Sequence, residues 1–182
     1  MRRWLGIALV AAVASGTAWA ASRLVYEETY GQDRAQIEDL QSRYLFALDW
    51  QDPQLYASTF TTDGVLIWAG GTVTGRSAIV KEMTQAKAVD ERAAAGTAPL
   101  RPARRRHFIS NVVLRIEGDR ATDRAYWFEF NDDDRDRRPY LGAYGHYEDE
   151  LQRVDGRWLF TKRHIFNEQR DDMAASPVNP AW

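Results

Sequence analysis

The sequence contains no cysteine among its 182 residues. This absence excludes disulfide bonds, zinc sites built on cysteine, cysteine-ligated iron–sulfur clusters and thiol catalysis. An excess of one charge is also absent, because 24 basic and 26 acidic residues give a net charge of −2. A protein with this balance has no general attraction to nucleic acid or to an anionic membrane. Any chemistry must therefore come from histidine, carboxylates, tyrosine, serine, threonine, arginine and lysine.

Long apolar runs are absent except at the amino terminus. Met1–Ala20 has two arginines after the initiator, an apolar stretch from Leu5 to Val13, and Ala18-Trp19-Ala20 before a cleavage point. This layout is typical of a secretory signal peptide. We predict cleavage after Ala20 and a secreted or periplasmic location. The uncharged stretch Trp4–Ser22 leaves an uncleaved membrane anchor open, because its 19 residues approach the roughly 20 that a membrane span needs.

The rest of the chain has the length and composition of one folded domain. Its 7 Trp, 8 Tyr and 7 Phe are too many for a disordered chain, and its length is too short for a TIM barrel. We interpret residues 21–32 as a linker, residues 33–168 as the domain and residues 169–182 as a loosely ordered tail.

Helical signals come first in the domain. Asp33 and Gln36 resemble a capping box, and an apolar stripe from Ile37 to Leu48 follows at helical spacing. Asp52 is a typical N-cap residue, and Pro53 after it is typical of the first turn of a helix. The predicted helices are one that begins at Asp33, one from Pro53 through Phe60, and one from Ala78 to about Ala94 that ends before Gly96.

Strand signals dominate the second half of the domain. Short strands over Val65–Trp68 and Thr72–Thr74 are predicted to pair through a turn at Gly70-Gly71. Longer strands are predicted over His107–Ile116, Ala121–Phe130, Tyr140–Val154 and Arg157–Phe166. This order predicts an α+β fold, a cone-shaped curved antiparallel or mixed sheet with helices packed on one face. A curved sheet of this kind leaves a pocket, which is where a ligand is expected.

The order and spacing of four segments resemble one protein family. The segments are RAQIEDLQSRYLFALDWQDPQLYASTFTTDGVL, GTVTGRSAIV, RHFISNVVLRIEGDRA and YEDELQRVDGRWLFTKR, which span roughly residues 33–166. They resemble the SnoaL-like branch of the nuclear-transport-factor-2-like superfamily. Members include scytalone dehydratase, the bile-acid dehydratase, ketosteroid isomerase and polyketide cyclases. The resemblance implies a cone-shaped α+β barrel, a homodimer or homotrimer, a small-molecule substrate or ligand, and no cofactor.

Tyr44 and Asp49 are the first candidate site residues. Dehydratase members of the family carry a tyrosine and, five residues later, an aspartate that face the pocket from the first helix. Five residues turn a helix by about 500°, so the two side chains point about 140° apart. They can converge only if the pocket covers the end of the helix. The alternative is a core tyrosine and a solvated aspartate near Asp52.

His107 is the candidate proton acceptor. Strand alternation places it on one face with Ile109, Asn111 and Val113, which mixes polar and apolar residues as a pocket wall does. Histidine titrates near neutral pH and can accept a proton from carbon. The resemblance implies this base role for His107, with Asp49 orienting the ring, and Asn111 is a candidate substrate contact. The alternative is a solvated histidine beside the arginines at 104–106.

Arg163 and Tyr147 are predicted to bind the substrate. The resemblance places an arginine of the last strand in the pocket, where a guanidinium could hold a carboxylate or polarise a carbonyl. A one-residue bulge would exchange Arg163 for Lys162 and leave Arg163 paired with an acid on the surface. Tyr147 is a pocket residue or a core aromatic, and His146 on the opposite face is expected to be exposed.

These residues predict a dehydratase or isomerase that acts on a small apolar carbonyl compound. His107 would remove the proton next to the carbonyl while Asp49 fixes its tautomer. Tyr44 would hydrogen-bond the developing oxyanion or protonate the leaving hydroxyl, and Arg163 would anchor a polar end of the substrate. The alternative is an exported module that binds a small ligand without catalysis.

Other site classes lack their motifs in this sequence. It has no HExxH or similar histidine spacing for a metal, no glycine-rich phosphate loop and no GxSxG nucleophile turn. Epoxide hydrolysis, found in another branch of the superfamily, needs an Asp–Arg–Asp set that cannot be assembled here.

Overall fold

The computed structural model describes residues 29–96, 103–171 and 178–182. The predicted signal peptide at residues 1–20 and residues 21–28 of the predicted linker lie outside the described residues, and residues 29–32 of that linker are helical. The chain divides into two compact units at residue 35, and the fold and site below belong to the second, residues 36–182. Among the described residues, no helix combines the length and apolar character that a membrane crossing requires.

The first helix is already formed at residue 29 and ends at residue 49. Asp33 therefore lies inside a helix, and the prediction that it caps one is wrong. The short helix α2 (Pro53–Ser58) is capped as predicted, because the Asp52 carboxylate accepts hydrogen bonds from two backbone N–H groups of its first turn. Helix α3 (Arg76–Ala95) ends at Gly96, also as predicted.

The strands form one six-stranded sheet. Its strands are β1 (Phe60–Trp68), β2 (Gly71–Thr74), β3 (Arg105–Glu117), β4 (Arg120–Asn131), β5 (Tyr140–Val154) and β6 (Arg157–Asn167). The order is β2-β1-β6-β5-β4-β3, in which only β1 and β6 run parallel. β2 and β3 are the two edges, so the sheet does not close on itself.

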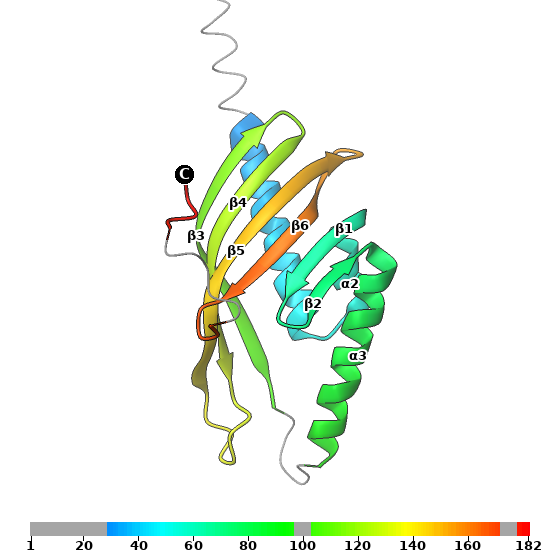
Figure 1. The fold of residues 1–182 in the computed structure, drawn as a ribbon, viewed down its shortest axis with the longest axis vertical. Coiled ribbons are helices and arrows are strands. Elements are labelled where there is room, and N and C mark those ends of the chain that lie inside the picture. The colour runs from blue at the N-terminus through cyan, green and yellow to red at the C-terminus, as the bar shows by residue number, and fades with distance from the viewer. Residues whose placement is uncertain (1–28, 97–102, 172–177) are drawn as a thin grey trace, which may run out of the picture. The chain divides into compact units, whose positions relative to one another are not determined.

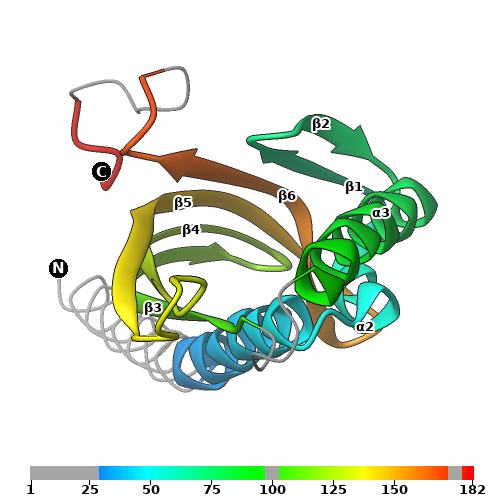
Figure 2. The same ribbon diagram turned by 90° about the horizontal axis from the view of Figure 1, so that it is seen from below.

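The long strands β3–β6 lie side by side and bend together (Figure 1). Figure 2 looks along these strands and shows the helices on the inner side of the bend. The predicted fold class is confirmed: an α+β arrangement with a curved mixed sheet and helices on one face. The predicted short hairpin β1–β2 forms, but its turn is at Ala69-Gly70, one residue earlier than predicted, because Gly71 of β2 already pairs with Trp68. β1 begins five residues earlier than expected, at Phe60 rather than Val65.

The core fills the space between the first helix and the inner face of the sheet. Leu40 and Tyr44 of the helix and Phe60 and Phe160 of adjacent strands are fully buried. The Tyr44 ring lies 5.8 Å from that of Phe160 and 6.3 Å from that of Phe60. Full burial of one such apolar side chain stabilises a fold by about 1.5–3 kcal/mol. This packing fixes the helix against β1 and β6.

A β-bulge in β3 decides which of its side chains face inward. The register of the β3–β4 pair shifts between residues 110 and 113, and Asn111 in the bulge has a φ of +55°. Beyond the bulge Leu114 is buried while Val113 is exposed. The prediction that Asn111 and Val113 share a face with His107 is wrong, because one extra residue inverts the alternation of a strand.

A second bulge lies in β6. Phe160 pairs with Leu151 and Lys162 pairs with Glu150, so Thr161 is the extra residue. Phe160 and Arg163 are consequently both buried on the inner face. The bulge weighed for this strand from the sequence would move Arg163 outward. The bulge that forms has the opposite effect and brings Arg163 in.

Candidate functional site

An interior cavity of about 250 Å³ is bordered by the first helix, α2, α3 and the inner face of the sheet. Its lining residues are Tyr44, Leu48, Tyr56, Leu66, Trp68, Ala69, Met83, Ala86, Arg105, His107, Trp127, Glu129, Ala143, Tyr147, Ile165 and Asn167. Apolar side chains make up most of this wall, and its polar groups include a tyrosine pair, a histidine–glutamate pair, Arg105 and Asn167. A few oriented polar groups in an apolar wall are typical of a small-molecule site.

His107 is held between two carboxylates. Its Nδ1 lies 2.7 Å from Oδ1 of Asp49, and its Nε2 lies 2.9 Å from Oε2 of Glu129. Asp49, at the end of the first helix, also accepts a hydrogen bond of 3.1 Å from the backbone N–H of His107. The His107 and Glu129 side chains are each 11% exposed and that of Asp49 is 5% exposed. Asp49 thus fixes the ring, while Nε2 and Glu129 border the cavity.

The two carboxylates favour the charged form of His107. Burial alone would lower the pKa of His107, but hydrogen bonds with Asp49 and Glu129 outweigh burial and raise it above its ordinary value. Burial would likewise raise the pKa of Glu129, but hydrogen bonds from His107 and Asn131 lower it to about 2. The resting site therefore favours an imidazolium beside an ionised glutamate.

Glu129 was not among the predicted residues, and the bulge in β3 explains why. In a hairpin without a bulge, the pairing that starts at the turn at residues 118–119 would place Phe130 opposite His107. The bulge shifts this pairing by one residue, so Glu129 is the partner of His107. Directly opposed residues point to the same face of a sheet, so their side chains meet. The available sequence signal was Asn111, since asparagine is enriched where the backbone takes a positive φ.

Tyr44 and Tyr56 form a hydroxyl pair in the cavity wall. Their oxygens are 2.7 Å apart and their rings 4.6 Å apart. One hydroxyl donates to the other, so the second proton remains for a ligand oxygen. Burial raises the pKa of Tyr44, partly offset by the charge of Arg163, and burial raises the pKa of Tyr56 further. Both hydroxyls are therefore neutral donors. Tyr56 comes from α2 and was not predicted.

Tyr147 fits both interpretations that the sequence left open. It is almost fully buried and its ring stacks on Trp127 at 6.0 Å, as a core aromatic does. It also lines the cavity. Asn111, by contrast, is exposed in the bulge and is not among the lining residues.

Arg163 lies beneath the cavity wall and does not line the cavity. Its side chain is fully buried, with Nε 3.0 Å and Nη2 2.6 Å from the carboxylate oxygens of Asp149. Its Cζ lies 4.1 Å from the ring centroids of Tyr44, Tyr147 and Phe160. The guanidinium is therefore paired and enclosed, and it has no face open to a substrate.

Asp123 completes this buried polar group. It is fully buried, pairs with Asp149 across β4 and β5, and accepts a hydrogen bond from Nε2 of Gln41. Burial and the charge of Asp149 raise the pKa of Asp123 well above its ordinary value.

Comparison with known proteins identifies the family. A family model for the SnoaL-like domain matches residues 29–164. The chain belongs to the SnoaL-like family. The resemblance seen in the sequence is therefore confirmed. No curated protein matches the chain.

Solved structures similar to this SnoaL-like chain cover most of the molecule. A Catenulispora acidiphila protein in complex with S-DNPA is 28% identical, covers 75% of this chain and 94% of its own, and has a TM-score of 0.62. A Mycobacterium tuberculosis protein of unknown function is 25% identical, with coverages of 80% and 82% and a TM-score of 0.61. A scytalone dehydratase-like protein of Novosphingobium aromaticivorans is 22% identical, with coverages of 85% and 96% and a TM-score of 0.62. The last likeness shows the fold alone.

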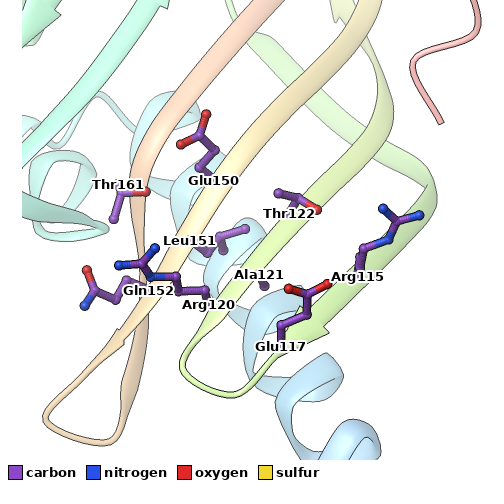
Figure 3. Close-up of a pocket in the computed structure, with 9 residues that line it drawn as sticks. All are labelled: Arg115, Glu117, Arg120, Ala121, Thr122, Glu150, Leu151, Gln152 and Thr161. Atoms are coloured by element: carbon purple, nitrogen blue, oxygen red, sulfur yellow. The ribbon is translucent and has the colours of Figure 1, made fainter. Parts of the chain in front are cut away.

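The SnoaL-like domain has a larger depression at the far end of the sheet, near the β3–β4 and β5–β6 turns (Figure 3). Its volume is about 520 Å³, and charged and polar side chains such as Arg115, Arg120 and Glu150 line it. Figure 3 shows these side chains extending in different directions without converging on one point. None of the predicted site residues lines this depression.

His146 of the SnoaL-like domain is buried, so its predicted exposure is wrong. It is 3% exposed, its ring stacks on that of Phe166 at 4.5 Å, and its Nδ1 lies 2.9 Å from Oε1 of Glu168. These two residues, at and after the end of β6, cover the ring. Among the side chains that the structure describes, no group of three or more histidine and acidic residues could hold a metal ion.

Proposed function

We propose that this SnoaL-like domain is a lyase or isomerase that acts without a cofactor on a small, largely apolar carbonyl compound. One observation carries the proposal: an oriented histidine and a pair of neutral tyrosine hydroxyls line the same apolar cavity. A proton next to a carbonyl is acidic enough for a positioned side chain to remove it without a metal. The family supports this reaction class, since it includes dehydratases and cyclases.

His107 is the base in the proposed reaction. In the neutral ring, Asp49 holds the proton at Nδ1 and leaves the lone pair of Nε2 toward the cavity. The substrate takes the place of Glu129 beside Nε2, and the proton moves from the α-carbon to Nε2, which leaves an enolate. In a dehydration the imidazolium then returns that proton to the leaving hydroxyl as the carbon–oxygen bond breaks. In an isomerisation it returns the proton to another carbon.

The tyrosine pair stabilises the enolate oxygen. The free proton of the Tyr44–Tyr56 pair donates to the carbonyl oxygen, and this hydrogen bond strengthens as negative charge develops. The apolar wall excludes water, which makes the same hydrogen bond stronger than it would be in solution. Glu129 returns to the imidazolium between turnovers.

Solvent deuterium uptake tests the proposal without a known substrate. Small enolisable ketones and β-hydroxy ketones are incubated in D₂O, and exchange at the α-carbon is followed by NMR. The wild type should accelerate exchange or dehydration of at least one compound, and His107→Ala should slow it by about 10²–10⁴-fold. His164→Ala is the matched control, because His164 does not line the cavity. An undiminished rate in folded His107→Ala would falsify the proposal.

The pH profile assigns the direction of proton transfer. Because the pKa of His107 is raised above 6.5, the neutral base becomes abundant only above that raised pKa. The rate should therefore rise with pH through it. A rate that falls over the same range would make the imidazolium the acid and Glu129 the base. Ligands that bind across the pH series with no exchange or turnover would identify a non-catalytic binding module.

We further propose that the domain is exported and begins at Ala21 after cleavage, on the basis of the amino-terminal sequence. Intact-mass measurement of protein from a periplasmic or secreted fraction tests this. Retention of residues 1–20 in a membrane fraction would instead identify an anchor.

We also propose a homodimer or homotrimer formed through the outer face of the sheet. Phe108, Tyr126, Phe130 and Tyr144 on this face are 42–53% exposed. Large exposed apolar side chains that gather in one patch are typical of interaction surfaces. Light scattering at micromolar concentration should give a multiple of the monomer mass, and Tyr126→Glu should reduce it.

A further inference from the structure

An arginine-lined depression adjoins the cavity at His107. It has a volume of about 420 Å³, and its lining includes the consecutive residues Arg104, Arg105 and Arg106 together with Asp49 and His107. Arg105 and His107 also line the interior cavity. The two spaces therefore share part of their walls, and Arg105 is a wall residue of both.

Positive charge dominates this depression. Asp49 is the one acid among its lining residues, and its carboxylate already accepts two hydrogen bonds from His107. Arg106 is held in place because its Cζ lies 4.0 Å from the Trp50 ring centroid. Arginine thus outnumbers acid among the residues that line this depression, and the single carboxylate there is already hydrogen-bonded to His107. Such a local field attracts anions and raises their concentration at the site.

Arg105 is the arginine that can act on a ligand in the cavity. Its side chain is 53% exposed, and Nη2 lies 3.3 Å from a carboxylate oxygen of Asp90. A partly exposed ion pair of this kind contributes little stability and gives way readily to a better partner. The donor fork of a guanidinium matches the two oxygens of a carboxylate or phosphate.

We infer that the ligand carries an acidic group, a carboxylate or a phosphate, which Arg105 and its neighbours bind while the carbonyl part of the ligand occupies the cavity. The inference rests on the proposed function, because it requires a ligand beside His107. Arg105 acts here as a specificity-determining residue and touches no reacting atom. The acid-binding role that the sequence suggested for Arg163 thus falls to Arg105, which lines the cavity, whereas Arg163 does not.

Three probes with the same naphthalene ring test the inference. They are 2-naphthoate, 2-naphthyl phosphate and the neutral 2-acetylnaphthalene, whose affinities are measured by titration calorimetry or fluorescence. The variants are Arg105→Gln and the double variant Arg104→Gln/Arg105→Gln. Arg43→Gln is the matched control, because Arg43 is 51% exposed and pairs with Asp39 at 2.8 Å, yet lines neither space.

The wild type should bind at least one acid about tenfold more tightly than the neutral ketone, as charge-assisted hydrogen bonds allow. Arg105→Gln should remove most of this preference and leave the affinity for the ketone within twofold, whereas Arg43→Gln should change neither. A preference for the carboxylate alone or the phosphate alone then identifies the acid. The inference is overturned if the acids and the ketone bind with equal affinity, or if neither acid binds at millimolar concentration. It is also overturned if the double variant keeps the preference for the acid. A preference that Arg105→Gln abolishes, with no deuterium exchange in any ketone, overturns the proposed function and leaves the acid-binding role intact.

Discussion

Two clusters of acidic and cationic side chains lie on the inner face of the sheet, and they differ in how accessible they are to a ligand. The His107 group consists of Asp49, His107 and Glu129, and its side chains are 5–11% exposed beside the cavity. The Arg163 group consists of Asp149, Arg163 and Asp123, and its side chains are fully buried. Each group holds one cation against two acids.

The cation in each group determines what the group can do. Histidine exchanges a proton near neutral pH, so a histidine at a cavity wall can pass a proton to or from a ligand. Arginine stays charged at all working pH values, and Arg163 is enclosed by Asp149 and three aromatic rings. We therefore assign chemistry to the His107 group and stability to the Arg163 group.

The largest effect is expected from a substitution that breaks the Arg163 group. Arg163→Leu leaves Asp149 as an uncompensated buried charge, which costs about 3–5 kcal/mol of unfolding free energy. Urea unfolding followed by circular dichroism measures this loss. The double variant Arg163→Leu/Asp149→Leu should recover most of it, because replacing both partners of a buried pair by apolar groups is close to neutral. If Arg163→Leu instead keeps wild-type stability but loses ligand affinity, the assignment of the two groups is reversed.

The dependence of stability on pH separates the two groups. The folded pKa of Glu129 is about 2 against an ordinary value of 4.5, so its contribution is present above pH 4.5 and is lost as pH falls toward 2. The contribution is on the order of 3 kcal/mol. For Asp123 the folded pKa is raised, so its contribution has the opposite sign and is lost as pH rises.

Denaturant unfolding at a series of pH values measures both contributions. Glu129→Gln should remove the loss that the wild type shows between pH 4.5 and 2. The raised pKa of His107 stabilises the fold below pH 6.5, and this stability is lost as pH rises through the folded pKa. An acid limb that is identical in wild type and Glu129→Gln contradicts the ion pair with His107.

A smaller effect is expected from the tyrosine pair. Tyr44→Phe removes one of the two hydroxyls and leaves Tyr56 able to donate, so the exchange rate should fall about tenfold rather than vanish. Tyr56→Phe should give a similar loss, and the two variants combined should lose more than either. Tyr126→Phe, on an exposed outer-face residue, is the control. Equal rates in all of these variants would remove the tyrosines from the reaction.

The sequence predicted where the helices and strands of this fold lie better than it predicted which of their side chains face inward. Apolar periodicity and turn residues such as Asp155-Gly156 located the hairpins, because local backbone preferences decide them. The Tyr44–Asp49 spacing and His107 correctly pointed to residues that lie at or beside the cavity. Glu129 and the inward position of Arg163 depend on which residue opposes which across a strand pair, and one extra residue changes that for the whole strand.

The bulge that places Glu129 opposite His107 gives the smallest and most specific effect. Asn111 has a φ of +55°, which glycine adopts without strain and asparagine tolerates. Asn111→Gly should keep stability within about 1 kcal/mol of wild type and leave the exchange rate unchanged. Asn111→Val should cost about 1–2 kcal/mol, because a β-branched residue resists this conformation. It should also slow exchange, since relieving the strain shifts Glu129 away from His107. A lowered ligand affinity in Asn111→Gly would mean that the asparagine side chain contacts the ligand directly, as the sequence suggested, and that the bulge is not its only role.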